Sequence, residues 1–263
     1  MFTPRLVLSS LSGQSDAEWA RAGSEHAGAA ILGGIALDDA ARDAARDLLA
    51  RERDEFLPED PIAFVDHQLA TLEDVAIQPG FNVRSATPDP IGAVARVCRE
   101  REAFLEINAH CRQEELCAAG CGETLLRDTP RLLEFVETAA ATGVTVGVKV
   151  RAEVPGVELP ALAGDLEDAG AAYVHVDAMD TESVIADVVA ETDLFVIANN
   201  GVRDDASVSE YHEYGADAVS VGRPSDDPVV LRRVRAAVDR YWSRDRNRET
   251  TSATESSTPH PQR

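Results

Sequence analysis

Short apolar segments alternate along the chain with longer stretches rich in Ala, Arg, Glu and Asp. The apolar segments are hydrophobic at most positions, which is typical of β-strands covered on both faces. The strands predicted in this way are Arg5–Ser9, Ala29–Leu32, Phe81–Arg84, Ala103–Asn108, Val144–Val150, Ala172–Val176, Leu194–Ala198 and Ala218–Val221.

The stretches between these strands carry helix signals. Asp89-Pro90 and Thr129-Pro130 are typical of a helix start, and Gly143 is typical of a helix end. The predicted helices are Asp38–Arg53, Pro90–Arg101, Pro130–Thr142, Leu159–Ala169, Thr181–Thr192, Ser207–Tyr214 and a last one over about 228–244.

Strands that alternate with helices in this way predict a single-domain α/β fold, the (β/α)8 or TIM barrel, over residues 1–243. The alternative is an open doubly wound sheet, which usually has a G-x-G-x-x-G turn after its first strand. The residues from Ser9 to Gly13 contain no such turn, so the barrel is favoured. Residues 57–78 exceed the length of one connection and are predicted to form an extra helix or a lid. The polar residues 244–263 are predicted to be a disordered tail.

The composition, 44% hydrophobic and 27% charged, excludes a chain that is disordered throughout. No run of about 18 apolar residues is present, so no membrane span is predicted. The N-terminus also lacks the order of basic and apolar residues that marks a secretory signal. Four cysteines, Cys98, Cys111, Cys117 and Cys121, lie too close together for a secreted disulfide framework, which favours a reducing, cytoplasmic location.

The chain has 47 Asp and Glu residues against 25 Lys and Arg residues, a formal net charge of −22, and Lys149 is its only lysine. Such a chain is typical of a halophilic protein, which stays soluble in concentrated salt. There the electrostatic screening length falls to roughly 3 Å at about 1 M. A bias in nucleotide composition is the alternative explanation. A surface this acidic is a poor general binder of nucleic acid.

Polar residues gather where the predicted strands end, which is the edge that carries the active site in barrels of this kind. They are Ser9, Ser10, Asn82, Arg84, Asn108, His110, Cys111, Lys149, Arg151, His175, Asp177, Asn199, Asn200, Gly201, Gly222 and Arg223. A purely structural barrel has no reason to bring Asn, Cys, Lys and Arg together there, so these residues form the candidate site.

Lys149 is the most distinctive of these residues, at the end of the buried segment Val-Gly-Val-Lys-Val-Arg. A buried charge needs a partner or a ligand. Because the chain uses arginine at every other basic position, a compact ammonium has a specific purpose here. That purpose is either to neutralise an electron-rich cofactor or to form a Schiff base.

The last two predicted strands end in Asn199-Asn200-Gly201 and Gly222-Arg223, where barrels of this type often hold a phosphate. Glycine lets backbone N–H groups approach an anion, and Arg223 can pair with phosphate oxygens. The pattern therefore indicates a phosphate site, with ordinary strand-to-helix turns as the alternative.

Cys111 follows the fourth predicted strand directly and could act as a nucleophile, a proton donor or a metal ligand. The spacing to Cys117 and Cys121 contains no C-x2-C element, so neither a zinc site nor an iron–sulfur site is expected. His175 lies in the sixth predicted strand, and its role stays open between packing and function.

Four strand-end motifs resemble those of the tRNA-dihydrouridine synthase family. LEINAHCRQEELCAAGCGETLLRDTP is similar to the fourth-strand motif, in which an Asn and a Cys precede a Gly-rich loop that ends in Leu-Leu. VTVGVKVR resembles the fifth-strand Lys-x-Arg, VIANNGVRD the seventh-strand Asn-Gly turn, and GADAVSVGR the eighth-strand phosphate motif. The resemblance covers about residues 6–226 and is strongest in the second half.

The resemblance implies a barrel that binds FMN and is reduced by NAD(P)H. At the matched positions Lys149 would contact the flavin ring, where its cation would stabilise the reduced flavin. Asn82 falls where the family has a flavin-contacting Gln. The residues implied for the FMN phosphate are Asn200, Gly201, Gly222 and Arg223.

The implied reaction is reduction of the C5=C6 bond of a uracil base. Cys111 would protonate C5 while reduced flavin delivers hydride to C6, and Asn108 and Arg151 would bind the base. The implied partner is tRNA. The alternatives are a free pyrimidine, as in dihydroorotate or dihydropyrimidine dehydrogenases, and a flavin-binding barrel without catalysis.

The sequence departs from the family at several points. The family's Gly-Cys-Pro is His110-Cys111-Arg112 here, and its sixth-strand His falls on Asp177, two residues after His175. Only one helix is predicted after Arg223, where the family has a helical domain that grips tRNA.

Overall fold

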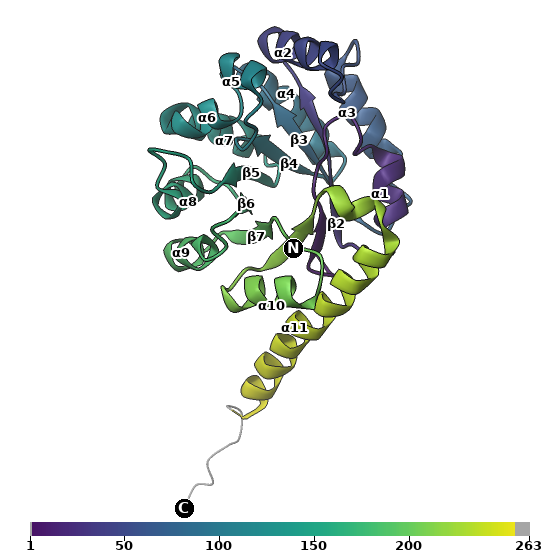
Figure 1. The fold of residues 1–263 in the computed structure, drawn as a ribbon, viewed down its shortest axis with the longest axis vertical. Coiled ribbons are helices and arrows are strands. Elements are labelled where there is room, and N and C mark those ends of the chain that lie inside the picture. Colours follow the sequence, from purple (N-terminus) through teal and green to yellow (C-terminus); the bar gives the residue numbers. More distant parts are fainter. Residues whose placement is uncertain (1, 256–263) are drawn as a thin grey trace, which may run out of the picture.

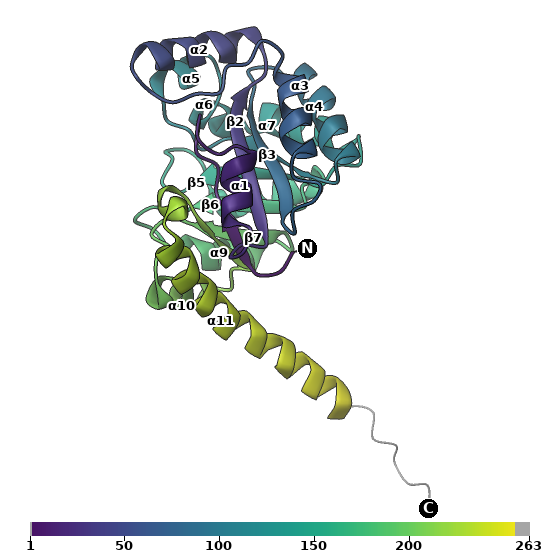
Figure 2. The same ribbon diagram turned by 90° about the vertical axis from the view of Figure 1, so that its right-hand side faces the viewer.

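The computed structural model describes residues 2–255, and the side chains of residues 2–243. Eight parallel strands close into a barrel in chain order, with β8 returning to pair with β1. Helices surround the barrel (Figures 1 and 2), which confirms the predicted TIM barrel. The strands are β1 (Leu6–Leu8), β2 (Ala29–Ala36), β3 (Gln78–Arg84), β4 (Phe104–Asn108), β5 (Val146–Arg151), β6 (Tyr173–Asp177), β7 (Phe195–Asn199) and β8 (Ala218–Val221).

The helices begin and end close to the predicted positions where capping residues set the boundary. Asp38, predicted as the first helical residue, is instead a cap whose side chain accepts a hydrogen bond from the Ala41 N–H at 2.9 Å. The helices are α1 (Ala17–Gly23), α2 (Asp39–Ala50), α3 (Pro61–Ala70), α4 (Asp89–Glu100), α5 (Glu114–Ala118), α6 (Glu123–Arg127), α7 (Thr129–Ala140), α8 (Leu159–Asp168), α9 (Val184–Glu191), α10 (Asp205–Glu213), the 3-10 helix η1 (Arg223–Asp226) and α11 (Pro228–Glu255).

Several elements differ from the prediction. Strand β2 continues to Ala36, four residues beyond its predicted end at Leu32, with a register shift between Gly33 and Ile35. Helices α1, α5 and α6 were not predicted, since they are five to seven residues long and show little periodicity. The segment 57–78 contains α3, which packs against α4 on the outside of the barrel (Figure 2).

The last helix is longer than predicted. Helix α11 packs beside α10 and then projects beyond the barrel to Glu255 (Figures 1 and 2). Residues 244–255 thus continue α11, and the division of the chain into a barrel over 1–243 and a tail over 244–263 stays a prediction. A helix that is already nucleated by packing adds each further residue at low cost, so a polar continuation can stay helical. The rest of the predicted tail, residues 256–263, lies outside the described residues.

The barrel interior is filled by every second residue of the strands, because successive side chains point to opposite faces. Toward the N-terminal ends of the strands these residues are apolar, and they form a cluster of Phe2, Val7, Ala29, Ile31, Phe104, Tyr173, Ile197 and Ala218. Gly147 makes room for the Tyr173 ring, since a Cβ at that position would lie 2.4 Å from ring carbons. The barrel is thus plugged at this end and has no central channel there.

The outward-facing strand residues pack against the surrounding helices. Leu8, Leu105 and Val148 are fully buried in one large apolar cluster that also contains Val94 of α4 and Phe135 of α7. Burial of each such side chain contributes about 1.5–3 kcal/mol, and this layer fixes the positions of the strands. Within the described part of the chain, no helix combines the length and apolar character needed to cross a membrane.

Candidate functional site

A buried carboxylate lies at the centre of the barrel's polar end. Glu106 of β4 is fully buried. Its Oε1 accepts a hydrogen bond from Asn82 Nδ2 at 2.7 Å, and its Oε2 lies 2.8 Å from His175 Nδ1. Because a carboxylate oxygen can only accept here, Nδ1 of His175 carries the ring proton.

One chain of hydrogen bonds runs from Glu106 up to the loop after β4. Asn108 Nδ2 donates to Asn82 Oδ1 at 2.8 Å, and Asn108 Oδ1 accepts from the backbone N–H of Cys111 at 3.2 Å. Asn82, Glu106 and Asn108 are all buried. Each amide donates toward Glu106, so the carboxylate orients both asparagines and, through them, the backbone of Cys111.

A second chain reaches Glu106 from β7 and β8. His175 Nε2 lies 2.7 Å from Ser220 Oγ, and Ser220 Oγ accepts from Asn199 Nδ2 at 2.6 Å. With Nδ1 protonated, Nε2 accepts the Ser220 hydroxyl proton, so this chain also donates toward Glu106. Both chains therefore end on one ionised carboxylate.

Lys149 of β5 is the cation of this buried layer. Its ammonium donates to Oγ of Ser9, the residue after β1, and its side chain is almost fully buried. Burial lowers the pKa of Lys149, while the negative charges of Glu106 and Asp177 act in the opposite direction. The ammonium is therefore held in place by nearby acids and a hydroxyl rather than by one direct ion pair.

The titration of the network follows from the same arrangement. Burial is the largest influence on Glu106 and opposes its ionisation, but His175, Lys149 and Asn82 together lower its pKa. Burial, followed by the charge of Lys149, lowers the pKa of His175. The stable state at neutral pH therefore has Glu106 ionised and His175 neutral.

The sequence analysis missed Glu106 and Ser220, and it left His175 open. The alternation in Leu-Glu-Ile-Asn places Glu106 on the same face as Asn108, which was a candidate. That alternation could have identified Glu106 as an inward-facing residue. The partners Asn82 and His175 come from β3 and β6, so only the closed barrel brings them together.

Cys111 lies at the mouth of the barrel, above this network. Its thiol is free and half-buried, and all four cysteines of the chain are free. The loop that follows folds back on Cys111, whose carbonyl accepts from the Glu123 N–H at 2.9 Å. Only glycine fits at position 122, because its φ is +58° and a Cβ there would lie 2.1 Å from the Cys111 carbonyl oxygen. The loop thus holds Cys111 in one position.

Three adjoining cavities open at this mouth. One of about 480 Å³ extends from Ser10 to Cys111, and a second of about 480 Å³ extends from His110 to Asp177. A third, of about 390 Å³, is bordered by the turns after β7 and β8. Cys111 lines the first two, and Arg223 lines all three. We refer to them as the serine, histidine and glycine cavities.

The glycine cavity can hold an anion. A Cβ at Gly201 or Gly222 would meet no heavy atom within 4 Å, so both glycines face open space. Asn200, at φ +95°, is fixed by its amide donating to Asp177 Oδ1 at 2.9 Å. Among the described residues, Arg223 has neither an ion pair nor a side-chain hydrogen bond. Open backbone and an unpaired guanidinium together suit a phosphate.

Two further side chains border the histidine cavity. Arg151 is buried and its Nε lies 3.4 Å from Glu123 Oε1. His110 is half-buried, and its shielded Nδ1 has no hydrogen-bond partner in the described part of the chain. Burial, followed by the nearby charge of Lys149, holds the pKa of His110 well below its usual value. His110 is therefore a neutral imidazole at pH 7.

The predicted site residues fall into two sets. One set lines the three cavities and consists of Cys111, Arg151, Asn200, Gly201, Gly222 and Arg223. The other set, Asn82, Asn108 and Lys149, lies beneath the mouth in the buried network and lines none of these cavities. The described residues contain no group of three or more His, Cys, Asp or Glu side chains arranged to hold a metal ion.

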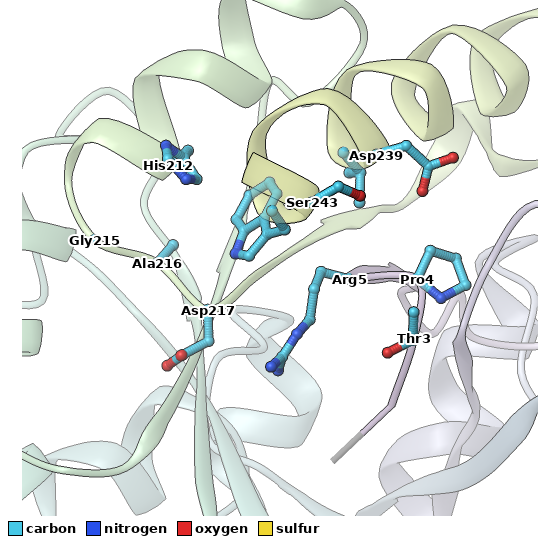
Figure 3. Close-up of a pocket in the computed structure, with 11 residues that line it drawn as sticks. Thr3, Pro4, Arg5, His212, Gly215, Ala216, Asp217, Asp239 and Ser243 are labelled. Carbon is cyan, nitrogen blue, oxygen red and sulfur yellow. The ribbon is translucent and has the colours of Figure 1, made fainter. Parts of the chain in front are cut away.

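A fourth cavity lies at the opposite end of the barrel, between the start of β1 and helices α10 and α11 (Figure 3). It measures about 340 Å³, and Arg5, Asp217 and Trp242 contribute to its wall. The Arg5 guanidinium lies 4.8 Å from the centre of the Phe195 ring, a cation–π contact that holds it against the barrel. This end carries the N-terminal ends of the strands, where conserved features of such barrels serve stability rather than chemistry.

Comparison with known proteins supports the fold. No model of a known protein family matches the chain. An uncharacterized protein of Methanocaldococcus jannaschii is 26% identical over 230 residues, which cover 83% of this chain and 88% of that protein. This protein is similar in size and sequence, and its name assigns no activity.

Solved structures resemble this barrel at low sequence identity. Morphinone reductase in complex with tetrahydroNAD matches with a TM-score of 0.63 and 14% identity, over 87% of this chain and 86% of that one. FabK from Thermotoga maritima matches with a TM-score of 0.56 and 16% identity, over 84% of this chain but only 61% of its own. A tryptophan synthase complex from Pyrococcus furiosus matches with a TM-score of 0.58 and 13% identity, over 92% of this chain and all of that one. These likenesses establish the chain as a TIM barrel.

Proposed function

We propose that this protein is an FMN-dependent oxidoreductase that reduces the C5=C6 bond of a uracil base. The observation that carries the proposal is the meeting of three features at one mouth: the free thiol of Cys111, the open glycine cavity and the unpaired Arg223. A thiol that can donate a proton and a site that can hold a cofactor phosphate are the two parts that this chemistry needs.

The glycine cavity fits the phosphate of FMN. The backbone at Gly201 and Gly222 is open to an approaching phosphate, and Arg223 can pair with its oxygens. Asn200 borders both the glycine and the histidine cavities, so it lies between the cofactor phosphate and the position of Cys111. When bound and reduced, FMN supplies the hydride.

The protein's own residues would supply the proton and the orientation. In the reaction, a hydride adds to C6 and the proton of the Cys111 thiol adds to C5, which leaves a saturated bond and a thiolate to be reprotonated from solvent. The Asn108 amide fixes the backbone of Cys111, and Arg151 faces the cavity in which the base would lie. Lys149 would place a positive charge beneath the mouth, where it favours an anionic reduced flavin.

The electron donor is proposed to be NAD(P)H. The likeness to morphinone reductase, which was solved in complex with tetrahydroNAD, supports this choice of donor. Among the substrates considered, both tRNA and a free pyrimidine offer the same C5=C6 bond to Cys111.

The first experiment is an absorption spectrum of the purified protein in high salt after incubation with FMN. We expect oxidised flavin bands at about 370 and about 450 nm that bleach when NADH or NADPH is added without oxygen. A protein that stays colourless after incubation with FMN and desalting would rule out the proposed cofactor.

The second experiment tests Cys111. Replacing Cys111 with Ala should lower the rate of uracil reduction by about 10²–10⁴-fold, the usual effect of losing a proton donor, while FMN stays bound. Cys117→Ala is the matched control, because Cys117 lies nearby on α5 and its thiol donates only to the Cys111 carbonyl at 3.4 Å. Equal rates for the Cys111 and Cys117 variants would show that Cys111 is not the proton donor.

A further inference from the structure

We infer that the substrate of this barrel is a pyrimidine nucleotide whose phosphate is bound in the histidine cavity by Arg53 and Arg112. The pyrimidine part of the inference rests on the proposed function. The phosphate part rests on the charges at the mouth, which can be examined separately.

The arginines at the mouth differ from most arginines elsewhere on the surface. Outside the mouth they commonly pair with acids, as Arg101 does with Asp66 at 2.7 Å and Arg235 does with Asp239 at 2.7 Å. Within the described residues, the side chains of Arg53, Arg112 and Arg223 make no ion pair and no hydrogen bond. In a chain with 47 acidic and 25 basic residues, three unpaired arginines that line the same cavity are a local excess of positive charge.

The unpaired arginines gather around one cavity. The histidine cavity is lined by Arg53, Arg112, Arg151 and Arg223, with Asp177 as its only carboxylate. That carboxylate already accepts a hydrogen bond from Asn200 at 2.9 Å. Since His110 is neutral, the cavity has an excess of positive charge that an anionic ligand would balance.

The neighbouring serine cavity has no such excess. Its basic residues, Arg53, Arg84 and Arg223, are matched by Glu52, Asp54 and Glu55. Arg84 is already paired with Glu55 at 2.6 Å, and both side chains are buried. The anion therefore belongs in the histidine cavity.

Arg53 and Arg112 are available for a second phosphate. Arg223 borders the glycine cavity, which is proposed to hold the cofactor, whereas Arg53 and Arg112 do not line it. Both of them line the histidine cavity together with Cys111. A ligand with its base at Cys111 could thus place a phosphate on these two guanidinium groups, whose planar donors match phosphate oxygens.

The charge distribution favours a single nucleotide over RNA. A chain of phosphates would meet the surrounding acidic surface of a protein with net charge −22, whereas the cations of the histidine cavity lie together at the mouth. A mononucleotide carries one phosphate and needs no wider basic surface.

The test is calorimetric titration of the FMN-treated protein with uridine monophosphate, uridine, inorganic phosphate and a short uridine-containing RNA. We expect uridine monophosphate to bind at least about tenfold more tightly than uridine, the effect of one or two charge-assisted hydrogen bonds. Arg53→Ala and Arg112→Ala should each lower the affinity for uridine monophosphate by about five- to tenfold and leave the affinity for uridine unchanged. Arg46→Ala is the control, since Arg46 is an exposed arginine of α2 that lines none of the mouth cavities.

Three results would overturn the inference: equal affinities for uridine monophosphate and uridine, arginine variants that bind like Arg46→Ala, or RNA that binds more tightly than the mononucleotide and is weakened by the same variants. Arg53 and Arg112 are exposed, so their replacement should leave the melting temperature unchanged, and melting curves verify this.

The same samples separate this inference from the proposed function. FMN uptake should be equal in the wild-type protein and in Arg53→Ala and Arg112→Ala, because neither residue lines the glycine cavity. A protein that binds FMN but does not distinguish uridine monophosphate from uridine contradicts the substrate alone. A protein that does not take up FMN contradicts the proposed function, while the nucleotide titrations still measure the phosphate site.

Discussion

The two ends of the barrel interior are built from the same strands and have opposite character. Moving two residues along a strand changes Val7 to Ser9, Phe104 to Glu106, Tyr173 to His175 and Ala218 to Ser220. The first residue of each pair belongs to the apolar cluster at the N-terminal ends of the strands, which we call the plug. The second is a buried polar residue beneath the mouth, and we call these residues the polar layer. One step of the alternation therefore separates an apolar layer from a layer of buried, hydrogen-bonded polar groups beneath the mouth.

The two layers are stabilised in different ways. Burial of apolar area stabilises the plug without directional requirements. The polar layer pays a desolvation cost that only complete hydrogen bonding offsets, and the bonds around Glu106 meet that condition. A defect in the plug should weaken the fold alone, whereas a defect in the polar layer should weaken the fold and disturb the mouth as well.

The largest effect is expected for Glu106→Ala. It removes the acceptor of Asn82 and His175 and the negative charge nearest to Lys149, and we expect a loss of about 3–5 kcal/mol in the free energy of unfolding, as for a broken buried ion pair. FMN uptake should fall too, because Asn82 and Asn108 lose their orientation. Denaturant unfolding and flavin absorbance measure both effects. A variant with wild-type stability would show that the network is not the support of the mouth.

A defect in the apolar plug should be smaller and confined to the fold. Ile31 is buried within the plug, and Ile31→Ala should lower the free energy of unfolding by about 2–4 kcal/mol through lost burial and a cavity. The amount of FMN bound per folded protein should stay at the wild-type level. If Ile31→Ala and Glu106→Ala lost flavin equally, the two layers would not be functionally distinct.

The sequence predicts the plug and the residues that line the mouth better than it predicts the polar layer between them. The apolar alternation identified all eight strands, and the residues directly after them included Cys111, Gly201 and Arg223, which do line the mouth. These are local features, because a strand end is visible in the sequence around it. The contacts of Glu106 depend on the register between β3, β4 and β6, which no local pattern contains.

Arg53 illustrates the same limit. The Ala-rich and Arg-rich pattern predicted a helix through Arg53, but α2 ends at Ala50, with Arg51 as its cap. Arg53 therefore lies in the following loop and lines the mouth rather than an outer helical face. A shift of three residues at a helix end is within the usual uncertainty of sequence patterns. Here it decides whether the Arg53 side chain lies on an outer helical face or at the mouth.

The smallest effect is a pH dependence of the polar layer. The pKa of His175 is lowered in the folded protein by burial and by Lys149, so the unfolded chain, with an imidazole pKa of about 6.5, binds the proton more readily. This stabilising contribution is complete above about pH 6.5 and is lost as the pH falls toward the folded pKa, at about 1.4 kcal/mol for each unit of difference.

The free energy of unfolding of the wild-type protein should thus decrease on acidification below about pH 6.5, before the carboxylates titrate near about pH 4. His175→Gln keeps a donor toward Glu106 and removes the titrating ring, so its stability should fall less steeply in this window and keep only the slope due to His110, whose pKa is also lowered. His67→Gln, an exposed position on α3, should retain the wild-type slope. A slope in His175→Gln as steep as that of the wild-type protein would mean that the acid sensitivity arises outside the polar layer, and that this layer differs from the plug only in hydrogen bonding and not in charge.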